Sequence, residues 1–360
     1  MIRTEFRTAL LRVTAGERPT REQLVALLQS DDEEFSLLAA AADRVRRTQV
    51  GDAIWLRGLI EFSNICRRRC LYCGLRAENQ TAERFRMSEE EILHAVRQVA
   101  ARGLGTVVLQ SGEDAWWNCE RLTALVESIK REHRELAVTL SIGERSRAEY
   151  ARLRTAGADR FLMRFETSNP QLYARMHPDS SLDERLQCLS WLTELGYEVG
   201  SGSLVGLPGQ TLLDLASDLL LMQQLQLDMI GIGPFIPHPC TPLADAAGGT
   251  AGMTLRMMAI TRLLCPKVNM PVTTALAALD PRGRERGWQA GANVVMPSAT
   301  PVPYKQQYEL YPDKPCLDDQ LTQCLTCLQG RIESIDRHLG SGRGNSPAWE
   351  AKQHAEDTAQ

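Results

Sequence analysis

From residue 53 onward, short apolar runs alternate along the chain with longer segments whose apolar positions recur at a helical spacing. The interval from one run to the next is nearly regular, and each run has the length of a strand. We identify eight predicted strands, at residues 53–62, 106–110, 136–142, 160–166, 198–207, 229–236, 269–276 and 292–297.

Amphipathic segments between these runs predict helices at residues 88–103, 119–134, 146–157, 182–196, 211–227, 252–264 and 281–291. Several end in glycine after a basic or long side chain, as helix C-termini do. Repeated strand–helix units predict a parallel sheet with right-handed crossovers, and eight units can close into a TIM-type (β/α)8 barrel. An open, doubly wound sheet is the alternative. The number of units, their spacing and the lack of a reversal in their order favour the barrel.

The two ends of the chain differ from this repeat. Residues 1–50 predict a helical extension, because one helical segment follows the capping residue Thr20 and the next begins with acidic and ends with basic residues. We assign residues 51–335 to the barrel together with a C-terminal cysteine segment. Residues 336–360 are polar and contain Gly and Pro, so we expect a disordered tail.

The composition is that of an ordinary globular protein, with 43% hydrophobic residues, 24% charged residues and a formal net charge of −4. This balance gives no electrostatic footprint for nucleic acid or for an anionic membrane. The N-terminal residues lack the apolar core of a signal peptide, and no run of 18 apolar residues occurs. We therefore expect a cytoplasmic protein with neither a nucleic-acid nor a membrane partner.

Ten cysteines in a reducing cytosol are candidate metal or cluster ligands rather than a disulfide framework. Six of them form two groups, Cys66, Cys70 and Cys73 in one, and Cys316, Cys324 and Cys327 in the other. A structural zinc site needs four protein ligands, whereas the first group offers three, with His94 as the nearest histidine. A catalytic zinc with three protein ligands remains an alternative, although an all-thiolate catalytic zinc is uncommon. A [4Fe–4S] cluster held by three cysteines leaves one iron open. Both interpretations are compatible with the residues of the first group alone.

Polar and Gly-rich residues follow nearly every predicted strand, for example at residues 63–66, 111–114 and 206–211. In a barrel these loops gather at the carboxyl end of the strands, where catalytic sites of such folds lie. Three adjacent arginines, Arg67, Arg68 and Arg69, stand in the first of these loops. They could raise the reduction potential of a cluster and attract an acidic electron donor, or form a solvated face of the loop. Both interpretations stay open.

The C-x3-C-x2-C spacing of Cys66, Cys70 and Cys73, on the loop after the first predicted strand, resembles the signature of the radical S-adenosylmethionine (SAM) superfamily. The resemblance implies a [4Fe–4S] cluster ligated by these three residues, with SAM bound to the open iron. It also implies that one electron from the cluster cleaves SAM to a 5′-deoxyadenosyl radical, and that the aromatic residue Tyr72 packs beside the adenine.

Over roughly residues 55–330 the chain resembles, more specifically, the HydE family of [FeFe]-hydrogenase maturases, whose relatives are biotin synthase and methylornithine synthase. The segments that carry this resemblance include EFSNICRRRCLYCGLR, VVLQSGED, GSGSLVGLPGQT, DMIGIGPFIPHP and YELYP. It implies that SAM is held by polar groups after several strands, at Ser111, Gly112, Glu113, Ser141, Glu166 and Arg185. Position 165 is Phe in this chain, where the resemblance leads us to expect His.

The same resemblance implies a substrate cavity inside the barrel, lined by Gln110, Thr139, Arg164, Met229, Thr273, Thr274, Tyr308 and Tyr311. The implied substrate is a cysteine-ligated Fe(CO)2(CN) complex, which the radical converts towards the diiron subcluster of the hydrogenase H-cluster. Met229 could instead serve core packing, and the two threonines simple strand propensity. Arg164 is harder to assign to packing, since a buried guanidinium needs an anionic or hydrogen-bonding partner.

The second cysteine group resembles an auxiliary [2Fe–2S] or [4Fe–4S] site found in part of the HydE family. Zinc binding, or no metal at all, remains an alternative for Cys316, Cys324 and Cys327. The resemblance also implies partners: an electron donor such as ferredoxin or flavodoxin, and other hydrogenase maturases.

Two further functions compete with maturation. A methylornithine-synthase-like mutase would keep the fold and act on an amino acid. A zinc-stabilised scaffold would bind a partner without catalysis, and would cleave no SAM.

Overall fold

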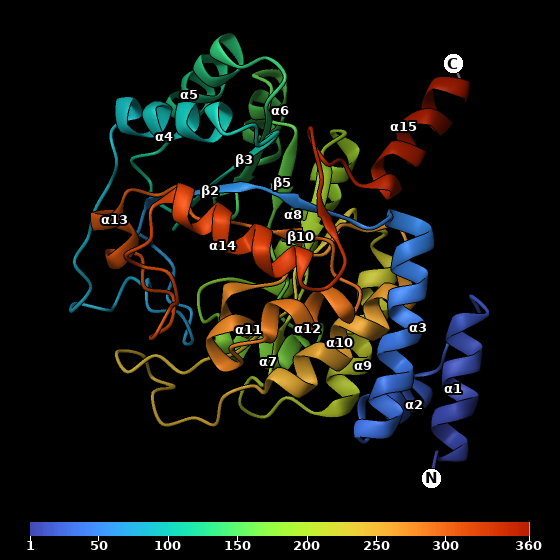
Figure 1. Ribbon diagram of the computed structural model, residues 1–360. Coiled ribbons are helices and arrows are strands. Elements are labelled where there is room, and N and C mark those ends of the chain that lie inside the picture. Colours follow the sequence, from blue (N-terminus) through green and yellow to red (C-terminus); the bar gives the residue numbers. More distant parts are fainter. Residues whose placement is uncertain (360) are drawn as a thin grey trace.

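The computed structural model describes residues 1–359 of the chain, and the side chains of residues 1–355. Its centre is a ring of parallel strands surrounded by helices (Figure 1). The strands are β1 (Ala53–Leu56), β2 (Gly58–Ser63), β3 (Thr106–Ser111), β4 (Ala137–Ser141), β5 (Arg160–Leu162), β6 (Glu198–Ser201), β7 (Leu204–Val205), β8 (Met229–Ile230), β9 (Gly233–Pro234), β10 (Val294–Val295) and β11 (His338–Leu339).

The ring closes through short pairings after β8. Six strands form one parallel sheet in the order β2-β3-β4-β5-β6-β8. Met229 of β8 then bridges to Asn269, Pro271 bridges to Val294 of β10, and β10 pairs with β1. Because β1 and β2 are consecutive parts of one extended segment, these parallel pairings complete a barrel. The barrel prediction is confirmed, and the open sheet is excluded.

Helices follow the strands and cover the outside of the ring (Figure 1). They are α4 (Glu89–Ala101), α5 (Cys119–Glu132), α6 (Arg147–Thr155), α7 (Pro170–Met176), α8 (Leu182–Glu194), α9 (Leu212–Gln224), α10 (Ala251–Leu264), α11 (Thr274–Leu279), α12 (Gly283–Gln289), α13 (Val302–Gln307) and α14 (Leu321–Glu333). In the described part of the chain, no helix combines the length and the apolar character that crossing a bilayer requires.

Capping boxes set the start of four of these helices. Ser88, Ser146, Ser181 and Thr211 each accept a hydrogen bond from the backbone N–H three residues later, and the acidic side chain at that later position accepts one from the cap. Two backbone donors that the helix leaves unsatisfied are thereby paired at each start. The polar residue that follows each loop therefore fixes where the helix begins.

The helices predicted for residues 1–50 are present as α1 (Thr4–Thr14), α2 (Arg21–Leu28) and α3 (Asp32–Val50). They lie together on one flank of the barrel, where α3 packs on α10 and α2 packs on α9 (Figure 1). Buried apolar residues of α1 and α2, including Phe6, Leu24 and Leu27, belong to the same core as the barrel helices. The extension therefore shares its hydrophobic core with the barrel.

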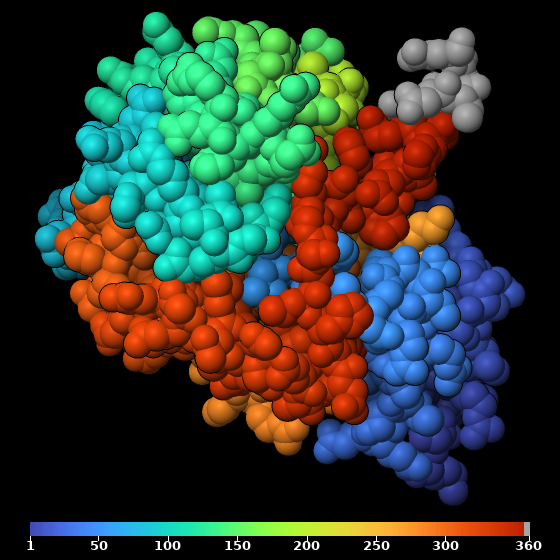
Figure 2. Space-filling model, turned by 45° about the horizontal axis from the view of Figure 1, so that its top comes forward, coloured from blue at the N-terminus to red at the C-terminus, as the bar shows by residue number. Residues whose placement is uncertain are grey.

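The prediction of a disordered tail is wrong for most of residues 336–360; residue 360 lies outside the described residues. Strand β11 pairs in parallel with β1, and α15 (Pro347–Ala359) follows it. Figure 2 shows the C-terminal segment, in red, lodged between the blue N-terminal helices and the green barrel helices. The polar composition that suggested disorder has a different cause, because these side chains and backbone groups bind charged residues of the barrel.

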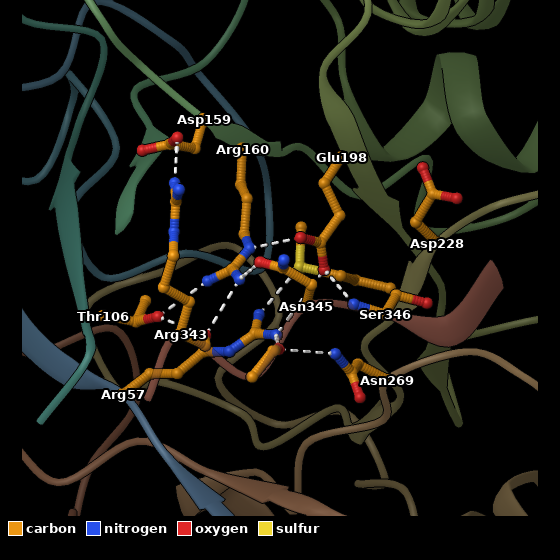
Figure 3. A network of polar contacts seen from close by, with 12 residues as sticks. Arg57, Thr106, Asp159, Arg160, Glu198, Asp228, Asn269, Arg343, Asn345 and Ser346 are labelled. Carbon is orange, nitrogen blue, oxygen red and sulfur yellow. Dashed lines mark hydrogen bonds and ion pairs between the residues drawn. The ribbon is translucent and has the colours of Figure 1, made fainter. Parts of the chain in front are cut away.

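These charged residues form a polar floor at the amino ends of the strands (Figure 3). Arg160, at the start of β5, ion-pairs with Glu198 at the start of β6 and donates to Thr106 Oγ1 at 2.7 Å. Arg160 also donates to Asn345 Oδ1 at 2.7 Å, and the backbone N–H of Ser346 donates to Glu198 at 3.0 Å. The C-terminal segment therefore supplies the partners that charged groups buried at this end of the barrel require.

The seventh predicted strand, at residues 269–276, is wrong in its second half. Only Asn269 and Pro271 make parallel bridges, and α11 begins at Thr274. Thr273 is the N-cap of this helix, because its hydroxyl accepts a hydrogen bond from the backbone N–H of Leu276 at 3.3 Å. Threonine favours both strands and helix N-caps, so the apolar run alone could not distinguish the two.

We predict that Arg160→Met destabilises the protein by about 3–5 kcal/mol, because it leaves Glu198 buried without its main partner. The control is Arg147→Met, which breaks the exposed pair of Arg147 with Glu194 and should cost at most about 1 kcal/mol. Chemical denaturation of the cluster-free protein measures both. Similar losses in the two variants would show that the floor is not a special source of stability.

Candidate functional site

The first cysteine group lies on the loop that follows β2, and its three residues are half-buried. Two backbone hydrogen bonds attach this loop to other barrel segments: Leu71 N–H donates to Met176 O at 2.9 Å, and Gly74 N–H donates to Leu310 O at 3.0 Å. The loop is therefore held against the end of α7 on one side and the segment around residue 310 on the other.

The same loop is joined directly to the end of β3. Gly112 N–H donates to Ser63 O at 3.0 Å, Arg67 N–H donates to Glu113 O at 3.1 Å, and the backbone N–H of Glu113 donates to Cys66 Sγ at 3.4 Å. Gly112 has no room for a side chain, since a Cβ atom there would lie 2.4 Å from Ile65 O and 2.7 Å from Cys66 Cβ. Glycine at position 112 therefore permits the contact between the cysteine loop and β3.

The thiols lie in a common, poorly hydrated environment. Burial raises the pKa of Cys66 and of Cys70, and it raises the pKa of Cys73 to about 12. The negative charge of the neighbouring cysteines raises the pKa of Cys70 and Cys73 further. Among the side chains of residues 1–355, no three His, Cys, Asp or Glu groups converge closely enough to hold a single metal ion.

Glu166, in the segment that follows β5, has a strained backbone and an incompletely paired side chain. Its φ angle is +64°, in the left-handed region that side chains other than glycine rarely adopt. The side chain is buried, and burial raises the pKa of its carboxyl group. Oε1 lies 3.2 Å from Arg164 Nε, whereas Oε2 has no hydrogen-bond partner among the described residues. A buried carboxylate oxygen without a partner indicates a place for a ligand that donates hydrogen bonds.

Tyr72 is oriented by a histidine that the sequence analysis did not identify. Its hydroxyl lies 2.9 Å from His177 Nε2 and 3.4 Å from Glu166 Oε1. Burial lowers the pKa of His177 to about 3, so the imidazole is neutral. His177 Nδ1 lies 3.1 Å from the carbonyl oxygen of Tyr173, which can only accept, so Nδ1 carries the proton and Nε2 accepts from Tyr72. The phenol proton is thereby directed at His177 rather than at the carboxylate of Glu166.

Arg185, on α8, reaches the same region. Its Nε donates to Glu144 Oε1 at 2.7 Å, and its Nη1 donates to the backbone oxygen of Arg164 at 2.6 Å. Ser111 and Ser141 end the neighbouring strands β3 and β4 and are half-buried. The predicted residues Tyr72, Glu113, Glu166 and Arg185 therefore surround the cysteine loop at the carboxyl end of the barrel.

Other predicted residues lie deeper in the barrel. Gln110 Nε2 donates to the hydroxyl of the buried Tyr308 at 3.2 Å. Thr139 is buried, and its hydroxyl has no partner in the described part of the chain. Arg164 lies beside Gly233 and Thr273, since a Cβ atom on Gly233 would be 3.7 Å from Arg164 Nη1 and 3.3 Å from Thr273 Oγ1. These predicted residues thus bring hydrogen-bond donors and acceptors among the strands of the barrel.

Tyr308 and Tyr311 belong to a segment that an unpredicted ion pair holds in place. Lys314 pairs with the buried Glu61 of β2, and its ammonium group lies 5.4 Å from the centre of the Tyr308 ring. The hydroxyl of Thr300 also donates to Glu61, at 3.1 Å. Glu61 could have been noticed as an acidic residue within an apolar run, but its partner Lys314 is far away in the sequence.

Two of the predicted cavity residues have other neighbours as well. Met229 is buried near the floor, where its sulfur accepts a hydrogen bond from Arg57 Nη1 at 2.8 Å. Thr274 lines a small pocket next to the second cysteine group. Phe165, which stands where the family resemblance leads us to expect His, is fully buried in the hydrophobic core.

Two members of the second cysteine group line that small pocket, and the third, Cys327, does not. Cys316 and Cys324 line it together with Arg284, Lys305 and Lys314. Cys324 and Cys327 are three residues apart on α14, the first buried and the second exposed. Three cationic side chains beside these cysteines would stabilise thiolates or an anionic cluster. The cysteines and the cationic side chains around this pocket therefore fit an anionic metal cluster.

The residues of the first site fit both an iron–sulfur cluster and an organic ligand. Three thiols on one loop are the donor set that iron–sulfur clusters prefer. Next to them, Arg185 suits a carboxylate, and the unpaired oxygen of Glu166 suits an ammonium or hydroxyl group. A ligand with amino-acid groups beside the thiols would satisfy both.

Comparisons with known proteins agree with this geometry. Residues 60–222 match the family model described as the radical SAM superfamily. The chain is 48% identical to the [FeFe] hydrogenase maturase subunit HydE of Thermotoga maritima, over 90% of this chain and 93% of that protein.

Two further similar proteins are methylornithine synthases. The 3-methylornithine synthase of Methanosarcina acetivorans is 29% identical over 79% of this chain and 81% of its own length. A crystal structure of methylornithine synthase (PylB) superposes with a TM-score of 0.81 at 25% identity, covering 96% of this chain and 99% of that chain. The barrel with its N-terminal extension is therefore shared with that enzyme.

We predict that Gly112→Ala displaces the cysteine loop, because the added methyl group meets backbone atoms that cannot rotate away. Overpacking of this kind costs about 1–3 kcal/mol, and here the strain falls on Cys66. Iron content after anaerobic reconstitution should fall clearly below the wild-type value. Gly330→Ala, in α14 where a Cβ atom meets open space, is the control and should keep full iron content. Normal iron content in both variants would contradict the assigned role of Gly112.

Proposed function

The chain belongs to the radical SAM superfamily and, within it, to the HydE family, and we propose that it acts in maturation of the [FeFe]-hydrogenase H-cluster. The observation that carries the proposal is the 48% identity to the Thermotoga maritima HydE over nearly the whole length of both proteins. It is a radical SAM enzyme, with a [4Fe–4S] cluster and SAM as its cofactors. We expect it to work in the cytoplasm, together with the other hydrogenase maturases and an electron donor such as ferredoxin or flavodoxin.

Cys66, Cys70 and Cys73 would hold the [4Fe–4S] cluster. When bound, this cluster supplies the electron that cleaves SAM to a 5′-deoxyadenosyl radical. The chain's own part is to keep the three thiols on one loop and to fix that loop against Gly112 and Glu113. The raised pKa values of the thiols mean that cluster binding must displace protons, as the binding of metal centres to thiols does.

Polar groups around the loop would orient SAM. The guanidinium of Arg185 suits its carboxylate, and Glu166 suits its ammonium or ribose hydroxyls through the oxygen that has no partner. Backbone groups of Ser111, Gly112 and Glu113 and the hydroxyl of Ser141 complete the proposed site. Tyr72, directed by His177, offers an aromatic ring for the adenine and packs against apolar residues that include Leu172 and Leu204.

The proposed substrate is a cysteine-ligated Fe(CO)2(CN) complex, which lies inside the barrel. Arg164, Gln110 and Thr139 supply donors for a carboxylate and for cyanide nitrogen, and the hydroxyl of Thr139 has no other partner among the described residues. Thr273, Thr274, Tyr308 and Tyr311 border this interior at its mouth. Met229 lies at its base, next to Arg57.

A mutase acting on an amino acid is the second candidate, favoured by the close superposition on methylornithine synthase. Sequence identity distinguishes the two, at 48% for the maturase against 29% for the synthase. We also propose that Cys316, Cys324 and Cys327 bind an auxiliary [2Fe–2S] or [4Fe–4S] cluster that takes no part in cleavage of SAM.

We predict that Cys70→Ser abolishes formation of 5′-deoxyadenosine, whereas Cys324→Ser retains it. The reason is that only the first group is adjacent to the proposed SAM site. Anaerobically reconstituted proteins are reduced with dithionite in the presence of SAM, and the product is quantified by chromatography. Equal loss in the two variants would contradict this division between the two cysteine groups.

We predict that the reduced protein with SAM supports activation of an apo-hydrogenase when the other maturases and the iron–carbonyl–cyanide–cysteine complex are supplied. The measurement is hydrogen evolution, with Cys70→Ser as the inactive control. Under the same conditions lysine, the linear isomer of 3-methylornithine, should remain unchanged. Rearrangement of lysine without hydrogenase activation would establish the mutase instead.

A further inference from the structure

The three adjacent arginines of the cysteine loop differ sharply in their surroundings. The side chains of Arg67 and Arg69 are 61% and 55% exposed, whereas that of Arg68 is 16% exposed. Arg69 pairs with Glu78, which is itself exposed at the surface. Arg68 is therefore the most buried of the three side chains.

Arg68 contacts three separate parts of the barrel rim. Its Nε donates to Glu113 Oε2 at 2.7 Å, at the end of β3. Its Nη2 pairs with Glu144 after β4, and its Nη1 donates to the backbone oxygen of Asp179 at 2.9 Å, before α8. A single guanidinium between Cys66 and Cys70 thus joins the cysteine loop to three neighbouring units of the barrel.

The two carboxylates that Arg68 binds differ in their other partners. Glu113 has a second guanidinium, since Arg67 Nε donates to the same Oε2 atom at 3.1 Å. Glu144 is buried, and its other cationic partner is Arg185, at 2.7 Å. Loss of Arg68 would therefore leave Glu113 paired with Arg67, but would leave Arg185 as the sole cationic partner of Glu144 among the described residues.

We propose that Arg68 is a positioning residue for SAM binding, because it shares the charge of Glu144 and so keeps Arg185 free to bind the carboxylate of SAM. The inference rests on the proposed role of Arg185 and adds to it a partner in the cysteine loop. It also assigns the middle arginine a function that concerns neither an electron donor nor solvation of the loop.

The physical basis is competition for one guanidinium. A buried carboxylate requires compensation, and removal of one of its two cationic partners concentrates its demand on the other. Arg185 would then be held more tightly by Glu144, and a second carboxylate would meet a guanidinium whose charge is already neutralised. With Arg68 present, the guanidiniums of Arg67, Arg68 and Arg185 face the two carboxylates of Glu113 and Glu144, so one positive charge remains for an incoming anion.

The test is the affinity for SAM of the reconstituted protein, measured anaerobically by isothermal titration calorimetry. Arg68→Met should raise the Kd for SAM about tenfold or more, corresponding to about 1.4 kcal/mol or more. Iron content should equal that of the wild type, because the three thiols are unchanged. Arg69→Met, which removes an exposed side chain of equal charge from the same loop, should shift the Kd by less than about twofold, as expected for a surface pair.

A double-mutant cycle separates charge sharing from simple loosening of the loop. In a Glu144→Gln background the competing charge is absent, so adding Arg68→Met should change the Kd by less than about threefold. An additive loss in that background would overturn the inference. So would an Arg68→Met protein that binds SAM as well as Arg69→Met, or one that loses its iron together with SAM.

The cycle also distinguishes this inference from the proposed function. A wild-type protein that binds no SAM would refute the proposed radical SAM site itself. A wild-type protein that binds SAM, with unchanged affinity in Arg68→Met, would refute only the role of Arg68.

Discussion

The contact between the cysteine loop and the end of β3 is the constraint on which the candidate site depends. It exists because Gly112 has no side chain: a Cβ atom would lie within 2.4 Å of the loop backbone. Through this contact the backbone N–H of Glu113 reaches Cys66 Sγ, and the Glu113 carboxylate meets Arg67 and Arg68. Gly112, at the end of a barrel strand, thereby holds the cysteine loop in place. The thiols of this loop lie beside Glu166 and Arg185.

Local patterns predicted much of this arrangement. The cysteine spacing, the glycine after β3 and the apolar runs are all short-range features, and the barrel and the loop follow from them. Interactions across long sequence separations were missed. His177 binds Tyr72, and Lys314 binds Glu61, over distances that no periodicity connects. The tail was misjudged for the same reason, because the partners of Asn345 and Ser346 are Arg160 and Glu198. A polar segment is predicted to be disordered only as long as the buried charges that it satisfies are unknown.

The threonine pair shows another limit of prediction from sequence. Thr273 and Thr274 were predicted at a strand end, but the first caps α11 and the second begins it. Since strand and N-cap preferences coincide in threonine, only the backbone around it decides. Even so, Thr273 remains beside Gly233 and Arg164. The prediction of its neighbourhood was therefore better than the prediction of its secondary structure.

The two ends of the barrel differ in how completely their buried charged groups are paired. At the floor, Arg160 and Glu198 have their partners within the chain, and the C-terminal segment completes them. At the mouth, Glu166 keeps an oxygen without a partner in the described structure and holds a strained backbone. Unsatisfied groups cost stability, and a fold retains them where a ligand supplies what is missing. The central ion pair of the floor is satisfied within the chain, whereas the buried carboxylate at the mouth is not, and this asymmetry agrees with a ligand site at the carboxyl ends of the strands.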